Sequence, residues 1–209
     1  MKLLLATRNR NKVTELQAML EGTGWQVVTL ADLEDMPDVE EDGATFEENA
    51  RKKARSAARR TKMWTLAEDA GLEVDALGGE PGVLSARYCG EGASDADRMR
   101  KVLDRIVAVP DERRTARFRC VMCLVDPAGN ETCFEGRCEG RISHHVRGSY
   151  GFGYDPIFMP DGQACTFGEL GQSVKSQISH RVRAMRQVIA FLKSRAELDG
   201  QTPQPQKPE

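Results

Sequence analysis

The sequence lacks the features that mark membrane, secreted or nucleic-acid-coating proteins. No apolar run approaches the ~20 residues of a membrane-spanning helix. The apolar start at residues 3–6 stops at Arg8, too early for the hydrophobic region of a signal peptide. A net charge of −2 argues against a general nucleic-acid coat. We therefore expect a cytoplasmic protein that binds neither membranes nor nucleic acid, and 209 residues suffice for one large domain.

The six cysteines do not make a clear metal pattern, although two residues separate Cys120 from Cys123 and both Cys133 and Cys138 follow. Residues 116–125 have the pattern of a strand, on which positions three apart point to opposite faces. This spacing therefore does not form a zinc knuckle without a turn. We interpret the cysteines as buried or half-buried thiols on a hairpin and, in a reducing cytosol, expect no structural disulfide.

Two common hydrolase signatures are also missing. The segment 7–12 lacks the glycines of a Walker A loop, and no Gly-x-Ser-x-Gly nucleophile elbow occurs. Ser179 and His180 are neighbours at the start of a predicted helix, where adjacent side chains do not face each other. These absences argue against a P-loop nucleotidase and a Ser-His-Asp hydrolase.

The hydrophobic pattern alternates between strands and helices and predicts a mixed α/β fold. The pattern Thr45-Phe46-Glu47-Glu48 is typical of a capping box that opens a helix. The predicted strands are residues 2–7, 25–30, 64–67, 115–126, 131–142 and 156–159. The predicted helices are residues 11–20, 45–60, 94–109 and 179–197. The predicted loops are residues 31–44, which are acidic, and 148–155, which are rich in glycine. We expect a single domain over residues 1–196 and a disordered Pro/Gln-rich tail over 197–209.

Residues 7–12 lie where a strand gives way to a helix. Backbone N–H groups at a helix start are unpaired, and the helix dipole favours an anion there. Arg8, Arg10 and Lys12 add positive charge. The segment is therefore either a phosphate-binding turn or an ordinary strand–helix loop.

Glu68 and Asp69 come at the end of a predicted buried strand. Adjacent carboxylates at a strand end suit Mg²⁺, which prefers hard oxygen ligands. Glu40 or Glu41, in the acidic loop, could supply a further ligand. The alternative is a solvated acidic turn.

The run Phe152-Gly153-Tyr154-Asp155 offers an aromatic face for a base, and its glycine permits close backbone approach. The alternative is a packed Gly-aromatic turn beside the strand at 156–159.

Five segments in this order and spacing carry a family resemblance. They are Leu5-Ala6-Thr7-Arg8-Asn9 with Lys12, Glu68-Asp69-Ala70-Gly71-Leu72, Pro81-Gly82-Val83-Leu84-Ser85-Ala86-Arg87-Tyr88, Gly151-Phe152-Gly153-Tyr154-Asp155-Pro156-Ile157-Phe158 and Ser179-His180-Arg181. From residue 3 to about residue 192, the sequence resembles the non-canonical purine nucleoside triphosphate pyrophosphatases, the family of inosine triphosphate and dITP/XTP pyrophosphatases.

The resemblance implies a strongly twisted mixed central sheet in two lobes, with the active-site cleft between them, and a homodimer. It implies a Mg²⁺-dependent hydrolase that cleaves ITP, dITP and XTP to the nucleoside monophosphate and pyrophosphate. Such an enzyme removes deaminated purines from the nucleotide pool.

The resemblance also assigns residue roles. Asp69 is implied as the general base or as a ligand of the metal that activates water. The implied metal ligands are Asp69, Glu40, Glu41 and Glu68. The implied substrate-binding residues are Thr7, Arg8, Asn9, Arg10, Asn11, Lys12, Ala70, Phe152, Gly153, Tyr154, Asp155, Lys175, His180 and Arg181. Lys175, His180 and Arg181 are implied to discriminate a 6-oxo purine.

One motif departs from the family pattern, which usually reads Asp-Asp-Ser-Gly where this chain has Glu68-Asp69-Ala70-Gly71. Ala70 removes a hydroxyl that would face the substrate. This change favours an alternative, a nucleotide-binding module without catalysis. A second alternative is a pyrophosphatase for another modified nucleotide, such as a pyrimidine. We expect activity because Asp69 and Gly71 are intact.

Overall fold

The structure, a computed structural model, describes residues 1–34 and 36–198. The chain divides into two compact units. In the described residues, the first unit holds 1–34, 36–69, 121–135 and 184–198, and the second holds 70–120 and 136–183. The described strands form a six-stranded sheet in the order β2-β1-β3-β4-β5-β6, in which β3, β4 and β5 contribute residues to both units.

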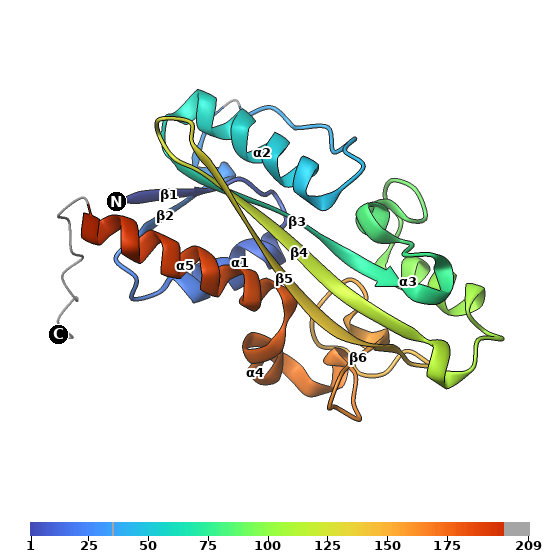
Figure 1. Cartoon of the computed structure of the whole chain (residues 1–209). Coiled ribbons are helices and arrows are strands. Elements are labelled where there is room, and N and C mark those ends of the chain that lie inside the picture. The colour runs from blue at the N-terminus through green and yellow to red at the C-terminus, as the bar shows by residue number, and fades with distance from the viewer. Residues whose placement is uncertain (35, 199–209) are drawn as a thin grey trace. The chain divides into compact units, whose positions relative to one another are not determined.

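The elements alternate as a mixed α/β protein should (Figure 1). The strands are β1 (Lys2–Leu5), β2 (Gln26–Thr29), β3 (Trp64–Val74), β4 (Thr115–Val125), β5 (Glu131–Ile142) and β6 (Phe158–Pro160). The helices are α1 (Arg10–Leu20), α2 (Phe46–Thr61), α3 (Asp95–Arg105), α4 (Phe167–Ile178) and α5 (His180–Leu198). Strand β1 pairs in parallel with β2 and β3, whereas β5 and β6 are antiparallel. The expected mixed α/β class with a mixed sheet is confirmed.

The first unit begins with two parallel crossovers. Strand β1 leads through α1 to β2, and the chain then returns through α2 to β3 on the other side of β1. Right-handed crossovers in opposite directions put their helices on opposite faces of a sheet. The strand order therefore reverses between β1 and β3, and this is the topological switch point where open α/β sheets bind ligands.

The second unit has its own hydrophobic core. Leu72, Val102, Ile106, Ile157 and Phe158 are fully buried in it. Arg114, also buried, donates side-chain hydrogen bonds to the carbonyls of Ile106, Val109, Ile142 and Ser143. A buried guanidinium with carbonyl acceptors satisfies its N–H groups without a buried counterion.

Several predicted boundaries need correction. Strand β3 does not stop at residue 67 but continues to Val74, because the apolar Leu72 and Val74 keep a buried strand going past Gly71. The predicted helix 179–197 is α5, with Ser179 ending the preceding helix α4, which the sequence pattern did not predict. Helix α5 extends to Leu198, so Glu197 and Leu198 of the expected tail are helical, and residues 199–209 lie outside the described residues.

The capping box at Thr45 is half formed. The Thr45 side chain accepts a hydrogen bond from the Glu48 amide at 3.1 Å, but the Glu48 carboxylate accepts from the amide of Ala44. The expectations of a single domain over 1–196 and of a cleft between two lobes stay predictions.

Candidate active site

Glu68 and Asp69 lie within β3 and not at its end, in the part of the strand that belongs to the first unit. Both are buried, with 1% and 6% of their surfaces exposed. The solvated acidic turn is therefore wrong, because two carboxylates in a buried strand are kept there only with partners that stabilise their charge.

The two carboxylates point to opposite faces of β3, as neighbouring residues of a strand do. The Glu68 carboxylate lies 3.1 Å from Nζ of Lys12 in α1. The Asp69 carboxylate accepts a hydrogen bond of 3.0 Å from the side-chain amide of Asn49 in α2. The helices that supply these partners are the two that the crossovers place on opposite faces.

The pair also has a defined position relative to β1. The pairing of β1 with β3 runs to Leu5 opposite Leu66, and the Ala6 amide donates to the Leu66 carbonyl at 2.8 Å. Glu68 and Asp69 therefore lie just past the carboxyl end of β1, at the switch point. A ligand bound just beyond the carboxyl end of β1 would be within reach of side chains from either face of β3.

Asp69 lies among charges of both signs. Nζ of Lys53 lies 3.8 Å from its carboxylate and 2.8 Å from that of Glu41, so one ammonium is shared by carboxylates from β3 and from the acidic loop. Burial raises the pKa of Asp69, while the nearby Lys53 ammonium acts in the opposite direction and Glu41 adds to the rise. A carboxylate with a raised pKa is a better proton acceptor than a solvated one.

Asn49 and Lys53 were missed by the sequence analysis. They lie one helical turn apart on α2, so they share a face of the helix. Asn49 is fully buried, and its side-chain oxygen accepts from the Gly43 amide at 2.8 Å while its amide reaches Asp69. A Cβ at Gly43 would lie 2.7 Å from that oxygen, so the acidic loop needs glycine there. One signal in the sequence could have identified Asn49, because it is a polar residue on the same helix face as the apolar Phe46 and Ala50.

The turn at residues 7–12 opens α1 with its own cap. Asn9 is the N-cap, and its side-chain oxygen accepts from the amides of Asn11 and Lys12 at 3.0 and 3.2 Å. Those two N–H groups are thus satisfied within the turn, unlike the unpaired groups expected from the sequence. The helix dipole remains, and the Lys12 ammonium near Glu68 supplies a full positive charge beside it.

The other members of this segment are more exposed. Arg8 donates to Asp38 at 2.6 Å and to the carbonyl of Met36, so it contacts the acidic loop. Thr7 is half-buried, and its hydroxyl accepts from the Asn9 amide. Arg10 and Asn11 are exposed. Their roles in substrate binding stay predictions.

A second cluster of the expected residues lies in the second unit. Nζ of Lys175 in α4 lies 2.7 Å from the Asp155 carboxylate, and both side chains are almost fully buried. The same ammonium lies 4.5 Å from the centre of the Phe152 ring, and the guanidinium of Arg181 lies 5.5 Å from it. The structure thus brings Phe152, Asp155, Lys175 and Arg181 together, with two cations near the half-buried Phe152 ring.

Asp155 also shapes the loop before it. Its carboxylate accepts from the Phe152 amide at 2.9 Å. Gly151 has φ +79°, and a Cβ there would lie 2.0 Å from that carboxylate, so only glycine fits. Gly153, at φ +65°, donates its amide to Asp95 at 2.7 Å. The loop therefore presents Phe152 through contacts of Asp155 and Asp95.

Two expected substrate-binding residues lie in the core of the second unit. Tyr154 is 4% exposed and its hydroxyl donates to the Ser85 carbonyl at 2.9 Å. His180 is 4% exposed and stacks on Phe118 with ring centres 4.8 Å apart. Through these contacts, Tyr154 and His180 help to position the neighbouring Phe152 and Arg181. A direct contact of either with substrate stays a prediction.

The remaining expected residues differ in burial. Ala70 follows Asp69 in β3 and is half-buried, while Glu40 is exposed and Glu41 is half-buried beside Lys53. Of the two acidic-loop candidates, Glu41 therefore has the contact that links it to Asp69. Within residues 1–34 and 36–198, no group of three or more His, Cys, Asp and Glu side chains is arranged to hold a metal ion.

Two further sequence predictions can be compared. The described part of the chain has no helix with the length and apolar character to cross a membrane. The cysteines, all within the described residues, form no disulfide, and Cys120, Cys123 and Cys138 are buried while Cys133 is half-buried. The interpretation as buried or half-buried thiols is confirmed for these four.

Comparison with known proteins gives a consistent result. The model of the Ham1 family matches residues 3–191. A dITP/XTP pyrophosphatase of Geobacter sulfurreducens is 48% identical over 184 residues, which cover 88% of this chain and 92% of that one. A dITP/XTP pyrophosphatase of Symbiobacterium thermophilum is 49% identical, covering 91% of this chain and 94% of that one.

Solved structures agree with the sequence comparison. The Ham1 protein of Staphylococcus aureus has a TM-score of 0.85 at 37% identity, covering 93% of this chain and all of that one. A nucleoside-triphosphatase/dITP/XTP pyrophosphatase of Mycobacterium abscessus has a TM-score of 0.76 at 44% identity, covering 90% of this chain and 98% of that one. The extent and identity of these matches show that the chain belongs to the Ham1 family.

Proposed function

We propose that this protein hydrolyses non-canonical purine nucleoside triphosphates, namely ITP, dITP and XTP, to the nucleoside monophosphate and pyrophosphate. Relatives at 48% and 49% identity over most of the chain carry the name dITP/XTP pyrophosphatase. The single observation that carries the proposal is the buried Asp69, held by Asn49 and flanked by the ammonium of Lys53 at the switch point. This arrangement supplies a proton acceptor and cations where a phosphate chain would be attacked.

The phosphate chain of the substrate is assigned to the residues around Glu68 and Asp69. Lys12, at the start of α1, and Lys53, in α2, bring positive charge to the two faces of β3 on which Glu68 and Asp69 lie. Positive charge stabilises the charge that develops on phosphate oxygens as the bond between the α- and β-phosphates breaks. Asp69 accepts the proton of the attacking water, and Asn49 fixes the orientation of its carboxylate.

We propose Mg²⁺ as the cofactor, and the donor chemistry fits it. Carboxylates of Glu41 and Asp69 already converge on one cationic group, the Lys53 ammonium, and carboxylate oxygens are the ligands that Mg²⁺ prefers. Asp69 and Glu41 would hold the ion, with Glu68 and Glu40 as the further expected ligands. When bound, Mg²⁺ neutralises phosphate charge and lowers the pKa of water.

Recognition of the purine base is assigned to the residues around Phe152. Phe152 offers a half-buried ring for stacking, and the cations of Lys175 and Arg181 lie against it. A 6-oxo purine carries a hydrogen-bond acceptor where adenine carries an amine, so a cationic donor rewards the oxo group. An amine there leaves a donor unpaired, at a cost of about 1–3 kcal/mol.

Product analysis tests the reaction. Purified protein incubated with dITP and Mg²⁺ should release pyrophosphate and dIMP in equal amounts, with no dIDP. Release of inorganic phosphate with dIDP would place the cleavage at the β–γ bond and contradict the assignment. Binding of dITP without any product would instead support the non-catalytic nucleotide-binding module that Ala70 favours.

A cytoplasmic homodimer completes the proposal. The family resemblance of the chain supports the homodimer. Light scattering on the purified protein should give twice the mass of one chain, and a monomer mass at all concentrations would reject the dimer.

A further inference from the structure

Strands β4 and β5 form the long hairpin of Figure 1, and each strand carries a cysteine near the turn, Cys123 and Cys133. At its turn, the amide of Asp126 donates to the carbonyl of Asn130 at 3.0 Å, which sets the register of the two strands. Counting the same number of residues from this pair along each strand leads to Cys123 on β4 and Cys133 on β5. Neither cysteine belongs to the candidate active site.

The pair occupies a position where side chains come close. Opposing residues of an antiparallel ladder alternate between hydrogen-bonded and non-hydrogen-bonded pairs. Because Asp126 and Asn130 form a hydrogen-bonded pair, Cys123 and Cys133 form a non-hydrogen-bonded one, for which Cα atoms lie ~4.5 Å apart. Disulfides span Cα distances of roughly 4.4–6.8 Å. The Cys123 and Cys133 thiols also lie near enough to shift each other's pKa.

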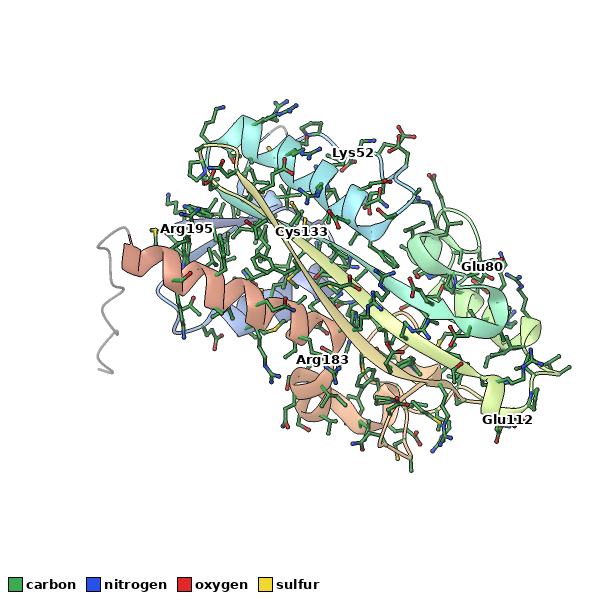
Figure 2. All side chains as sticks on the ribbon, in the orientation of Figure 1. Lys52, Glu80, Glu112, Cys133, Arg183 and Arg195 are labelled. Carbon is green, nitrogen blue, oxygen red and sulfur yellow. The ribbon has the colours of Figure 1, made fainter. Side chains whose placement is uncertain are left out.

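The two thiols have different surroundings. Cys123 is fully buried, whereas Cys133, marked in Figure 2, is half-buried on β5. Glu131, two residues before Cys133 and therefore on the same face of the strand, accepts a hydrogen bond of 2.8 Å from Arg51 in α2. The cysteine pair thus faces α2 and its guanidinium groups.

These surroundings favour the thiolate of Cys133. The hydrogen bond from the Cys123 thiol lowers the pKa of Cys133, and the charge of Arg51 acts in the same direction. The same hydrogen bond together with burial raises the pKa of Cys123. Burial, together with nearby carboxylates, raises the pKa of Cys138 to about 11. Because the thiolate is the reactive form, Cys133 is the more nucleophilic member of the pair.

We propose that Cys123 and Cys133 form a redox-active dithiol site that reacts with hydroperoxides, with Cys133 as the attacking and Cys123 as the resolving thiol. The Cys133 sulfur attacks a peroxide oxygen, so an S–O bond forms, the O–O bond breaks and the alcohol, or water from hydrogen peroxide, leaves with a proton. Cys123 then attacks the sulfenic acid of Cys133. The S–S bond forms, the S–O bond breaks, and the hydroxyl leaves as water with the Cys123 proton. Two thiols are oxidised and one peroxide is reduced.

The direct test uses the full chain and hydrogen peroxide as the probe. Cys89 is exposed and Cys165 is half-buried, so both are first replaced by Ser to prevent cross-linking between molecules. After peroxide treatment and digestion without reductant, mass spectrometry should find a Cys123–Cys133 linked peptide that a dithiol reductant removes. Absence of this peptide, while Cys133 stays a thiol or is oxidised to a sulfinic acid, would overturn the proposal.

Single variants test the order of attack and do not depend on the linked peptide. Cys123→Ser should accumulate a sulfenic acid on Cys133 that dimedone traps. In Cys133→Ser, the Cys123 thiol should react with peroxide at least tenfold more slowly than the Cys133 thiol does in the parent protein. At the same peroxide dose, Cys123 should therefore stay unmodified. Cys138→Ser is the matched control, a buried thiol on β5 that should not change formation of the link. Dimedone on Cys123 in place of Cys133 would reverse the roles and contradict the proposal.

Discussion

At the scale of single residues, Asp69 combines burial with charged partners. The residue is 6% exposed, and Asn49 and Lys53 contact its carboxylate. Burial raises the pKa of Asp69 because the charged form loses solvation. Burial of Asp69 therefore works against its ionised form and costs stability, as is common for catalytic groups.

Asp69→Asn is expected to abolish turnover and to raise the thermal unfolding midpoint at pH 7. Asparagine keeps the shape but removes both the proton acceptor and the buried charge. A raised folded pKa means that the ionised carboxylate destabilises the fold above that pKa, so its removal stabilises the fold at pH 7. The measurements are pyrophosphate release and calorimetry without added metal. More than about a tenth of wild-type turnover, a loss under ~1.4 kcal/mol of barrier, would contradict the catalytic role.

Ala70→Ser is expected to keep wild-type activity or increase it. Ala70 is half-buried next to Asp69, and the family pattern carries serine at this position. The added hydroxyl is small and can hydrogen-bond a nucleotide. Steady-state kcat/KM with dITP checks the expectation. A folded variant with strongly reduced turnover would mean that this site differs from that of the family and would favour the non-catalytic alternative.

At the scale of elements, α2 carries the side chains that define the surroundings of Asp69. Asn49 and Lys53 lie on one face, while Lys52, marked in Figure 2, pairs with the exposed Asp42. The pattern of capping residues predicted this helix, and its buried alanines follow from the helical period. The role of Asn49 and Lys53 could not be predicted, because their partners Asp69 and Gly43 are brought to them only by the fold.

Lys53→Ala is expected to lower kcat/KM for dITP by at least tenfold, about 1.4 kcal/mol of barrier. The substitution removes the ammonium shared by Glu41 and Asp69 and leaves like charges facing each other. Lys52→Ala, the neighbouring lysine on the same helix, is the control and should change kcat/KM less than twofold. Equal losses in the two variants would show that only the overall charge of α2 matters.

The ion pair of Asp155 with Lys175 holds α4 to the loop that carries Phe152. Asp155→Ala is expected to lower the free energy of unfolding by roughly 3–5 kcal/mol, because it leaves a buried ammonium without this partner. Denaturant titration measures the change. Asp161→Ala, at an exposed turn, should stay within about 0.5 kcal/mol of wild type. A small loss at Asp155 would mean that the pair adds little to folding and would favour a direct role in substrate binding.

At the scale of the whole molecule, the mixed α/β class was predictable from alternating patterns, but the path of β3 was not. The sequence analysis predicted a short strand over 64–67 with Glu68 and Asp69 at its end, whereas the buried Leu72 and Val74 carry the strand onward. As a result, Glu68 and Asp69 face opposite sides and recruit partners from α1 and α2 separately. Helix α4 was missed because its short sequence includes Gly168 and Gly171, the latter at φ +72° within the helix. Composition and hydrophobic periodicity do not indicate which residues distant in the sequence pair with Glu68 and Asp69.

The most direct test of the proposed function is a side-by-side measurement of kcat/KM for dITP, XTP, dATP and dGTP with the same protein and Mg²⁺. The proposed base recognition predicts turnover of dITP and XTP at least tenfold above that of dATP, with the monophosphate and pyrophosphate as products. It also predicts that Asp69→Asn abolishes all four activities together. Equal kcat/KM for dITP and dATP, or turnover that survives in the Asp69 variant, would contradict the account.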